Sequence, residues 1–373
     1  MINSFHVKNF KSLKQVDVPM GRLNLFMGMN GMGKSSVIQS LLLLRQSFEN
    51  QPVFFEQESN LSVLKINGEL VRLGTASDIL CQNADDDEIS WKLMFTGNSA
   101  FQASYVADGL KETSPAIKGE YKRAASIVKE ALFTDRFSYL SAEHIGPRQK
   151  YSFAEWDPAG MNWIGNNGQS AVPFLSVYGT KCEVPDIMRR QNARTKLLID
   201  ETSAWMQTVS PRIRMNAVQN VVDNDSQLLI SFEGERMTTN NISPVNVGFG
   251  VPYALPLIVA LLQSKPGDLI LLENPESHLH PKGQAAAAEL IARAAANGAQ
   301  IVCETHSDHI INGIRVAMKH NILHAGDMVV TYFDQDNSLD TLVTTIDVDQ
   351  SGNLSSYPPG LLDEWGDLMS ELI

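Results

Sequence analysis

One short segment constrains the fold of this chain more than any other. It reads Gly28-Met29-Asn30-Gly31-Met32-Gly33-Lys34-Ser35 and matches the pattern G-x-x-x-x-G-K-[ST] at every fixed position. An apolar run over 23–27 precedes it, and an apolar run over 36–44 follows it. Because strand, loop and helix are the context that a phosphate-binding loop requires, the segment predicts a nucleoside triphosphate site. A Gly-rich turn that fits by chance is the alternative.

The residue types of this loop suit phosphate chemistry. Its glycines let successive backbone N–H groups turn toward a phosphate, and the helix that follows adds the positive end of its dipole. Lys34 is expected to reach the β and γ oxygens, and the Ser35 hydroxyl to ligate Mg²⁺. The expected nucleotide-binding residues are Gly28, Asn30, Gly31, Gly33, Lys34, Ser35 and Ser36.

Length and composition limit the class of protein. With 373 residues, of which 43% are hydrophobic, the chain can bury a large core, and we favour one domain that carries an insertion. Cys81, Cys182 and Cys303 lie far apart, so neither a disulfide framework nor a structural zinc site is expected. We therefore expect a soluble, cytoplasmic protein without a signal peptide or a membrane span.

Charge is distributed unevenly along the chain. The net charge of −12 argues against a surface coated with basic residues for nucleic acid. Between residues 111 and 214, however, 15 Lys and Arg stand against 11 Asp and Glu. Candidates for phosphate contacts or for docking an acidic partner are Arg189, Arg190, Arg194, Lys196, Arg212 and Arg214. The alternative is a solvated helix face.

Hydrophobic patterns place an α/β core in the first and last parts of the chain, with an insertion between them. The expected strands lie over 2–20, where two surround a turn, and over 23–27, 64–74, 89–95 and 213–232. Helical spacing marks 121–133 and 186–206.

A second group of chemistry-bearing residues begins at 269–273, where four apolar residues end in Glu273. This pattern is typical of a buried parallel strand that delivers an acid to its C-terminal edge, where a P-loop fold holds Mg²⁺. Glu273 and Ser35 are therefore the expected metal ligands. A further short strand over 301–303 is followed by His306, which can reach the γ-phosphate.

The order of these segments resembles the ATP-binding-cassette (ABC) class of ATPases, in its soluble SMC, RecF and OLD branch. The first strand, Val7-Lys8-Asn9-Phe10-Lys11-Ser12, is similar to the opening strand of these proteins. Glu273-Asn274-Pro275-Glu276-Ser277-His278-Leu279-His280-Pro281 resembles their Walker B and D-loop, and Glu304-Thr305-His306-Ser307 their switch-histidine segment. Val247-Gly248-Phe249-Gly250-Val251-Pro252 stands in the place of the signature loop, and 346–365 resembles a small C-terminal module of one bacterial subset.

This resemblance implies an α/β fold, a P-loop NTPase of ABC type with a mixed sheet flanked by helices and an inserted helical and β lid region. The expected parts are an N-terminal core lobe with the P-loop over 1–75, an insertion with basic helices over 76–235, a second core segment over 236–345 and a C-terminal module over 346–373.

The resemblance also implies that two protomers sandwich two molecules of ATP with Mg²⁺. Gly248 and Gly250 would then offer backbone N–H groups to the γ-phosphate in trans, although Phe249 and Pro252 depart from the small or hydroxylic residues usual there. Lys11 and Ser12 are expected to touch the nucleotide from the first strand. The expected catalytic residues are Lys34, Glu273, Glu276 and His306.

The main departure from this class is Asn274. In the two-acid arrangement, the first carboxylate holds Mg²⁺ and the adjacent one polarises the attacking water. An amide can orient water, but it does not accept a proton at neutral pH. Either Glu276 takes over, which we favour, or hydrolysis is slow and the ATP-bound dimer is long-lived.

Other segments offer weaker candidates. His278 and His280 with Glu276 suggest a metal site, but contacts of a D-loop across a dimer are preferred. Gln149 is a candidate Mg²⁺ sensor, and a plain surface loop is its alternative. The run 328–336 lacks the acidic pattern of a TOPRIM nuclease, so its Asp334 and Asp336 are expected in a turn and no effector site is predicted.

The predicted function is an ATP-binding and ATP-hydrolysing molecular switch that controls a separate effector, a nuclease or toxin, in bacterial defence against phage. The role in defence is inferred by analogy with proteins of the same fold. The alternatives are a RecF-like DNA-repair ATPase that grips DNA through the basic middle region, and a scaffold stabilised by ATP with weak hydrolysis. The expected partners are further copies of this chain, an effector protein and, for the repair alternative, nucleic acid.

Overall fold

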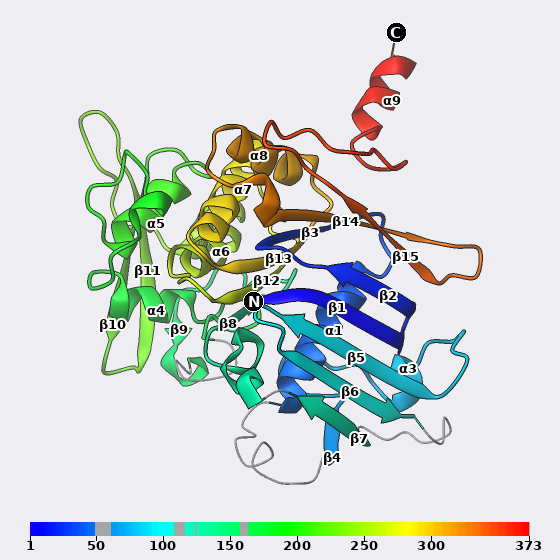
Figure 1. Cartoon of the computed structure of the whole chain (residues 1–373). Helices are drawn as coiled ribbons and strands as arrows, with labels where there is room; N and C mark the ends of the chain where they lie inside the picture. The colour runs from blue at the N-terminus through cyan, green and yellow to red at the C-terminus, as the bar shows by residue number, and fades with distance from the viewer. Residues whose placement is uncertain (49–60, 108–115, 124, 157–162, 373) are drawn as a thin grey trace. The chain divides into compact units, whose positions relative to one another are not determined.

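The computed structural model describes residues 1–48, 61–107, 116–123, 125–156 and 163–372 (Figure 1). These residues form two compact units. Unit 1 comprises Met1–Phe137, Met328–Asp349 and Leu354–Ile373, and unit 2 comprises Ser138–Asp327 and Gln350–Asn353. Within the described ranges, no helix combines the length and the hydropathy that crossing a bilayer requires.

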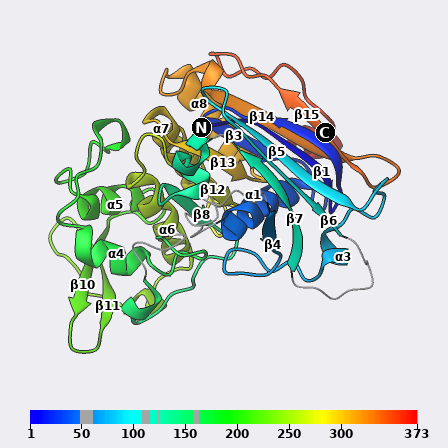
Figure 2. The same ribbon diagram turned by 60° about the horizontal axis from the view of Figure 1, so that its bottom comes forward.

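An antiparallel sheet forms much of unit 1, in the strand order β2-β1-β5-β6-β7-β4 (Figure 2). Its strands are β1 (Ile2–Phe10), β2 (Leu13–Pro19), β4 (Leu61–Lys65), β5 (Glu88–Phe95), β6 (Ala100–Val106) and β7 (Ala116–Arg123). Side chains alternate between a buried and a more exposed face along β1 and β6, as the two-residue period of a strand requires. The buried face carries Trp91, which packs edge-on against Phe10 and Tyr105.

The strand before the phosphate loop belongs to the second layer of unit 1. Strand β3 (Leu23–Met27) is buried along its whole length and pairs in parallel with β14 (Met328–Gln335). Strand β15 (Thr341–Ile346) pairs antiparallel with β14, so this sheet is mixed. Helix α1 (Lys34–Phe48) follows the loop, and Phe48 at its end packs edge-on against Phe101 and Tyr121 of the antiparallel sheet. The described residues of unit 1 also contain two short helices, α3 (Ala76–Ile79) and α9 (Glu364–Glu371).

Unit 2 contains the second group of chemistry-bearing residues. Strand β12 (Leu269–Glu273) pairs in parallel with β13 (Gln300–Glu304), and β8 (Phe137–Leu140) follows β12 in the sheet order. Three helices lie beside these strands: α6 (Gly250–Leu262), α7 (Pro281–Ala296) and α8 (Asp308–Lys319). A small antiparallel sheet contains β10 (Ile213–Asn220), β11 (Asp225–Phe232) and β9 (Tyr151–Ser152), and packs with α4 (Ala171–Tyr178) and α5 (Leu198–Met206).

Short 3₁₀ turns connect these elements. They are η1 (Ala125–Lys129), η2 (Ala131–Phe133), η3 (Phe153–Glu155), η4 (Asp186–Met188), η5 (Pro244–Asn246) and η6 (Ala325–Asp327). The α/β fold with a mixed sheet and flanking helices is as predicted, and so are the strands over 2–20, 23–27 and 89–95 and the hairpin within 213–232.

Two predicted helices are wrong. The segment 121–133 contains the end of β7 and two 3₁₀ turns, because Tyr121 pairs with Ala103 of β6 and is buried in the sheet. Within 186–206 only Leu198–Met206 is an α-helix. The connecting segment is extended instead at Arg189, whose neighbour Arg190 donates its backbone N–H to Glu201. The strand expected over 64–74 ends at Lys65.

Candidate functional site

The loop between β3 and α1 has a backbone that only glycine adopts easily. Gly28, Gly31 and Gly33 have φ angles of 133°, 84° and 101°. A Cβ atom at Gly28 would lie 2.2 Å from the carbonyl oxygen of Phe333, and one at Gly33 would lie 2.4 Å from Thr341 Oγ1. A Cβ atom at Gly31 would meet no neighbouring atom within 4 Å, so only the positive φ angle requires glycine there. The loop is therefore held in the shape of a phosphate-binding nest.

Lys34 points back into this loop. It begins α1, is 2% exposed, and donates hydrogen bonds from Nζ to the carbonyl oxygens of Gly28 at 2.8 Å and Met29 at 2.6 Å. Ser35 and Ser36 follow in the first turn of α1 and are half-buried. The Lys34 ammonium and the N–H groups at the N-terminus of α1 thus lie close together. This arrangement of donors suits the oxygens of a triphosphate.

Lys11 and Ser12, which are expected to touch the nucleotide, lie near the loop and the helix that follows it. Ser12 Oγ is 2.8 Å from Thr341 Oγ1, and Lys11 donates from Nζ to Gln39 of α1 at 2.6 Å. Burial lowers the pKa of Lys11. Both residues line a cavity of about 460 Å³, a size typical of small-ligand sites.

This cavity adjoins the loop itself. Gln335, another of its lining residues, donates to the carbonyl oxygen of Gly31 at 3.0 Å. Sequence reasoning missed Gln335 and Asp340, because they come from the end of β14 and the turn after it, about 300 residues after the loop, and no local pattern links them to it.

In unit 2, Glu273 ends β12 opposite Glu304 of β13. Ala142 donates its N–H to Glu273 Oε2 at 3.4 Å, and the Tyr139 phenol also hydrogen-bonds this carboxylate. Burial, with a further contribution from the charge of Glu304, raises the pKa of Glu273 to about 7, although the two hydrogen bonds oppose the shift. A half-buried carboxyl beside a second acid suits a divalent cation, whose charge would offset this repulsion.

Asn274 supplies a test of fit for Mg²⁺. Its backbone has a φ of 45°, and its N–H donates to the carbonyl oxygen of Glu304 at 2.9 Å. Its side-chain Oδ1 is buried and finds no hydrogen-bond donor among the residues that the structure describes. A buried amide oxygen of this kind commonly binds water, so a water of a hydrated cation fits beside Glu273.

Glu276 is fixed by the segment that follows β13. Thr305 donates from Oγ1 to Glu276 Oε2 at 2.8 Å, and the His306 N–H donates to Oε1 at 2.9 Å. Burial raises the pKa of Glu276, while these two bonds act in the opposite direction. The structure therefore brings Glu276 into contact with the backbone of His306. His306 itself is exposed.

Gly248 and Gly250 lie at the N-terminus of α6, which begins at Gly250. Phe249 between them is 62% exposed. The ring of Tyr253 packs against His278 in a tilted arrangement with ring centroids 4.2 Å apart, and stacks on His144 at 5.8 Å. The helix N-terminus, the turn after β12 and the loop after β8 are thus packed together, with backbone N–H groups at the surface.

The weaker candidates have other roles. Glu276 binds the segment after β13, His278 packs against the ring of Tyr253, and His280 caps α7 by accepting from the Lys282 N–H at 3.4 Å. Within the described ranges, no cluster of three or more His, Cys, Asp or Glu suits a metal. Gln149 is exposed, whereas Tyr139 and Ala142 reach Glu273.

The segment around 334–336 differs partly from expectation. Asp336 Oδ1 accepts from the N–H groups of Ser338 and Asp340, so it is a turn residue as predicted. Asp334 is not, because it lies within β14.

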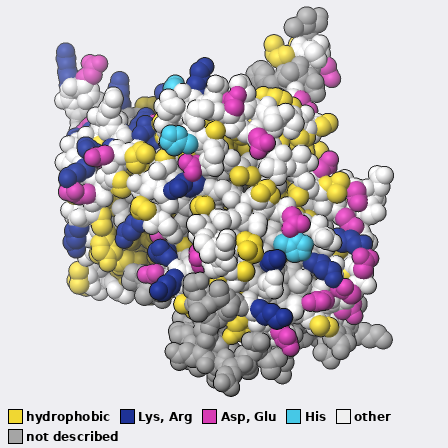
Figure 3. Space-filling view, viewed as in Figure 1, with side chains coloured by type: hydrophobic (Ala, Val, Ile, Leu, Met, Phe, Trp, Pro, Cys, Tyr) yellow, Lys and Arg dark blue, Asp and Glu magenta, His cyan; other side chains and the backbone are white. Residues whose placement is uncertain are grey.

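Basic residues of the middle region are largely neutralised by carboxylates. Figure 3 shows Lys and Arg interspersed with Asp and Glu over the part that contains α5 and the β10–β11 hairpin. The ion pairs are Arg189 with Asp186 and Glu201, Arg190 with Glu289, Arg194 and Arg214 with Glu233, and Lys196 with Glu183. This arrangement favours the solvated-face interpretation over phosphate contacts.

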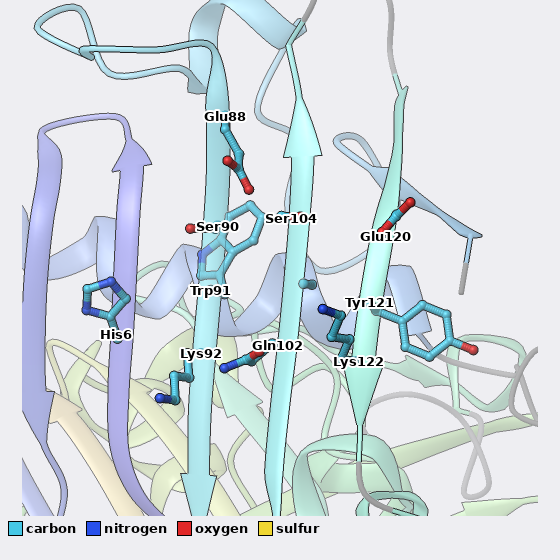
Figure 4. A pocket seen from close by; sticks show the side chains of 11 residues that line it. His6, Glu88, Ser90, Trp91, Lys92, Gln102, Ser104, Glu120, Tyr121 and Lys122 are labelled. Carbon is cyan, nitrogen blue, oxygen red and sulfur yellow. The ribbon is translucent and has the colours of Figure 1, made fainter. Parts of the chain in front are cut away.

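Another polar surface lies on the outer face of the antiparallel sheet of unit 1. A hollow of about 330 Å³ spans β1, β5, β6 and β7 (Figure 4). In one row across these strands, His6 pairs with Lys92, Lys92 with Gln102, and Gln102 with Lys122. Glu88 and Glu120 line the same hollow, so its charge is mixed.

Three protein-family models match parts of the chain. The model described as "AAA domain, putative AbiEii toxin, Type IV TA system" matches residues 132–312, and the model described as "AAA ATPase domain" matches residues 1–155. A third, described as a protein of unknown function, matches residues 323–372. No curated protein matches the chain.

Solved structures of SMC heads are similar to the whole chain. An SMC head bound to the C-winged helix domain of ScpA has 14% identity and a TM-score of 0.50, over 94% of this chain and 98% of that one. The SMC head domain from Thermotoga maritima has 11% identity and a TM-score of 0.47, over 93% of this chain and 99% of that one. An SMC head with an extended coiled coil, bound to the C-terminal domain of ScpA derived from Pyrococcus furiosus, has 13% identity and a TM-score of 0.49, over 100% of this chain and 99% of that one. The first of these likenesses shows a shared fold.

Proposed function

We propose that the chain is a P-loop ATPase of the ABC type, in the SMC and RecF branch, and that it is a molecular switch that binds and hydrolyses ATP with Mg²⁺. The observation that carries this proposal is the loop Gly28–Ser35, with three glycines at positive φ and the Lys34 ammonium directed into it. Two copies of the chain dimerise around ATP, and the ATP-bound dimer is the active state of the switch.

The residues divide the chemistry between them. Lys34 and the loop N–H groups would hold the β and γ phosphates. Ser35 and Glu273 are the predicted ligands of Mg²⁺, whose charge would stabilise the negative charge that develops on the transferred phosphoryl group. Asn274 orients water through its buried amide oxygen. Glu276 accepts the proton of the attacking water, since it is the next carboxylate after Glu273 in the sequence and is already fixed by Thr305 and His306.

We further propose that the switch acts on a separate effector in defence against phage. The description of one matching model as an AbiEii toxin of a type IV toxin–antitoxin system supports this context. Support for a protein partner comes from the SMC head of similar fold, which is bound to a domain of ScpA. Gly248 and Gly250, at the exposed start of α6, contribute backbone N–H groups to the γ-phosphate of the second copy.

A DNA-binding ATPase is the second candidate. The ion pairs of the middle region argue against a grip through residues 189–214, but the row of His6, Lys92, Gln102 and Lys122 offers donors to phosphate oxygens. A DNA-binding protein would bind duplex DNA with an affinity that falls as salt rises, and DNA would stimulate its hydrolysis. Lys92→Gln with Lys122→Gln would abolish that binding.

The proposed function is tested with the wild type, Glu276→Gln and the control Glu143→Gln, which removes an exposed carboxylate from the loop after β8. Light scattering gives the mass with and without ATP and Mg²⁺, and phosphate release gives turnover. We expect ATP to raise the mass of all three proteins, and turnover of Glu276→Gln to fall by about 100-fold or more.

Each result decides a different point. Unchanged turnover of Glu276→Gln would remove Glu276 from catalysis. A mass that does not respond to ATP would refute the switch, and a wild type that binds ATP without releasing phosphate would leave the scaffold as the better function.

A further inference from the structure

The helix at the C-terminal end of the described chain is amphipathic. Helix α9 runs from Glu364 to Glu371. Its described apolar residues Leu368, Met369 and Leu372 are spaced i, i+1, i+4, which places them on one face. The acidic residue Glu371 falls beside that face. This pattern is typical of a helix that lays its apolar face into a groove on a protein.

The apolar side chains of α9 that the structure describes are in solvent. Leu368 is 51% exposed, Met369 45% and Leu372 80%, whereas Leu361 before the helix is 2% exposed. The segment is anchored just before α9, because Tyr332 donates from its hydroxyl to the carbonyl oxygen of Pro359 at 2.6 Å. The helix beyond this anchor, at the end marked C in Figure 1, therefore presents an uncovered apolar face on a fixed base.

A groove that suits such a helix runs along α7 and α8 of unit 2. It encloses about 540 Å³, and its floor consists of small residues: Ala285, Ala286, Gly313 and Ala317. Gly313 allows the two helices to approach closely, since a Cβ atom there would lie 2.6 Å from the Cβ of Ala288. Val316 lines the groove and is 52% exposed. The groove is thus an open apolar channel between two rigid helices.

Charge at the groove is complementary to α9. Its rim carries Lys282, Arg190 and Arg293, and the acid Glu289 pairs with both arginines. The rim is therefore positive overall, and His309 and His320 add further nitrogen donors. After Lys319 the chain contains no Lys or Arg at all, so the C-terminal segment is purely acidic. Opposite charge steers and aligns an amphipathic helix in such a groove.

We propose that α9 of one copy of this chain docks in the α7–α8 groove of a second copy. Each chain carries this helix and this groove, so two copies can exchange helices reciprocally. This contact forms without nucleotide, and it is separate from the ATP-dependent dimer proposed above.

Two variants and one control test the docking by analytical ultracentrifugation without nucleotide. Leu368→Glu places a charge on the helix, Val316→Glu places one in the groove, and Val222→Glu alters a valine that is 93% exposed near the β10–β11 turn. We expect a dimer for the wild type and the control, with a dissociation constant at least about tenfold higher for each of the other variants.

Mixing the two defective variants shows which copy supplies the helix. Leu368→Glu keeps an intact groove and Val316→Glu keeps an intact helix, so the mixture should form a dimer that neither forms alone. If α9 docks within its own chain or on another protein, the wild type is monomeric and mixing changes nothing, and the proposal is wrong.

A peptide of residues 360–373 with a fluorescent label provides a readout that does not depend on the mass. It should bind the Leu368→Glu chain, with an affinity that falls as salt rises, and should not bind the Val316→Glu chain. Equal binding to both chains would refute the groove as the docking site.

Discussion

Glu273 makes the stability of the protein without Mg²⁺ dependent on pH in a defined window. Burial and the charge of Glu304 raise its pKa from 4.5 to about 7 in the folded protein. Between these two values the folded state keeps a proton that the unfolded state has lost, so the free energy of unfolding falls as the pH rises and is constant above about 7. A shift of about 2.5 units corresponds to about 3 kcal/mol, or about 2 kcal/mol once solvent screening of a half-buried group is included.

Glu273→Gln removes this titration. Urea unfolding in EDTA, at pH 5 and pH 8, should show that the wild type loses about 2 kcal/mol more than the variant between the two pH values. Glu143→Gln, which removes an exposed carboxylate, should follow the wild type to within about 0.5 kcal/mol. If Glu273→Gln and the wild type lose equal stability, the carboxyl titrates normally and its burial beside Glu304 has no electrostatic effect.

Two further predictions concern the loop and the basic region. Gly28→Ala should destabilise the protein by at least about 2 kcal/mol and abolish ATP binding, because its Cβ would lie 2.2 Å from the carbonyl oxygen of Phe333. Thermal unfolding measures the loss of stability, and filter binding of labelled ATP measures the loss of binding. Normal ATP binding by the variant would contradict this prediction. Arg189→Met should cost about 3 kcal/mol in urea unfolding, because the side chain of Glu201 is 0% exposed and loses its charge partner. Glu201→Leu in the same chain should restore most of this loss, and a double variant as unstable as Arg189→Met would refute the argument.

Predictions from local patterns were the most successful. The phosphate loop, the strand that ends in Glu273 and the hairpin around residues 221–224 depend on neighbours in sequence, so a spacing of residues specifies them. Glu276 and the segment at His306 were predicted for one site, and the structure joins them by a hydrogen bond.

Contacts between distant segments were not predictable in this way. The segment 121–133 has helical spacing, but its first residues pair with β6 as part of β7. A strand is stabilised by partners that its own sequence does not reveal. Tyr139 reaches Glu273 because β8 follows β12 in the sheet, and Thr341 meets Ser12 across 329 residues of sequence. The sequence left phosphate contacts and a solvated face both open for the basic stretch, since the carboxylates that pair with it lie up to 99 residues away.

Strand β14 joins the phosphate loop to the end of the chain over two adjacent residues. The carbonyl of Phe333 limits the space at Gly28, and the hydroxyl of Tyr332 holds Pro359. Because Tyr332 and Phe333 are adjacent, the wall beside Gly28 and the anchor of the segment before α9 lie one residue apart on the same strand. A fluorophore attached to the last helix would test whether phosphate binding at the loop is detected at the C-terminal segment.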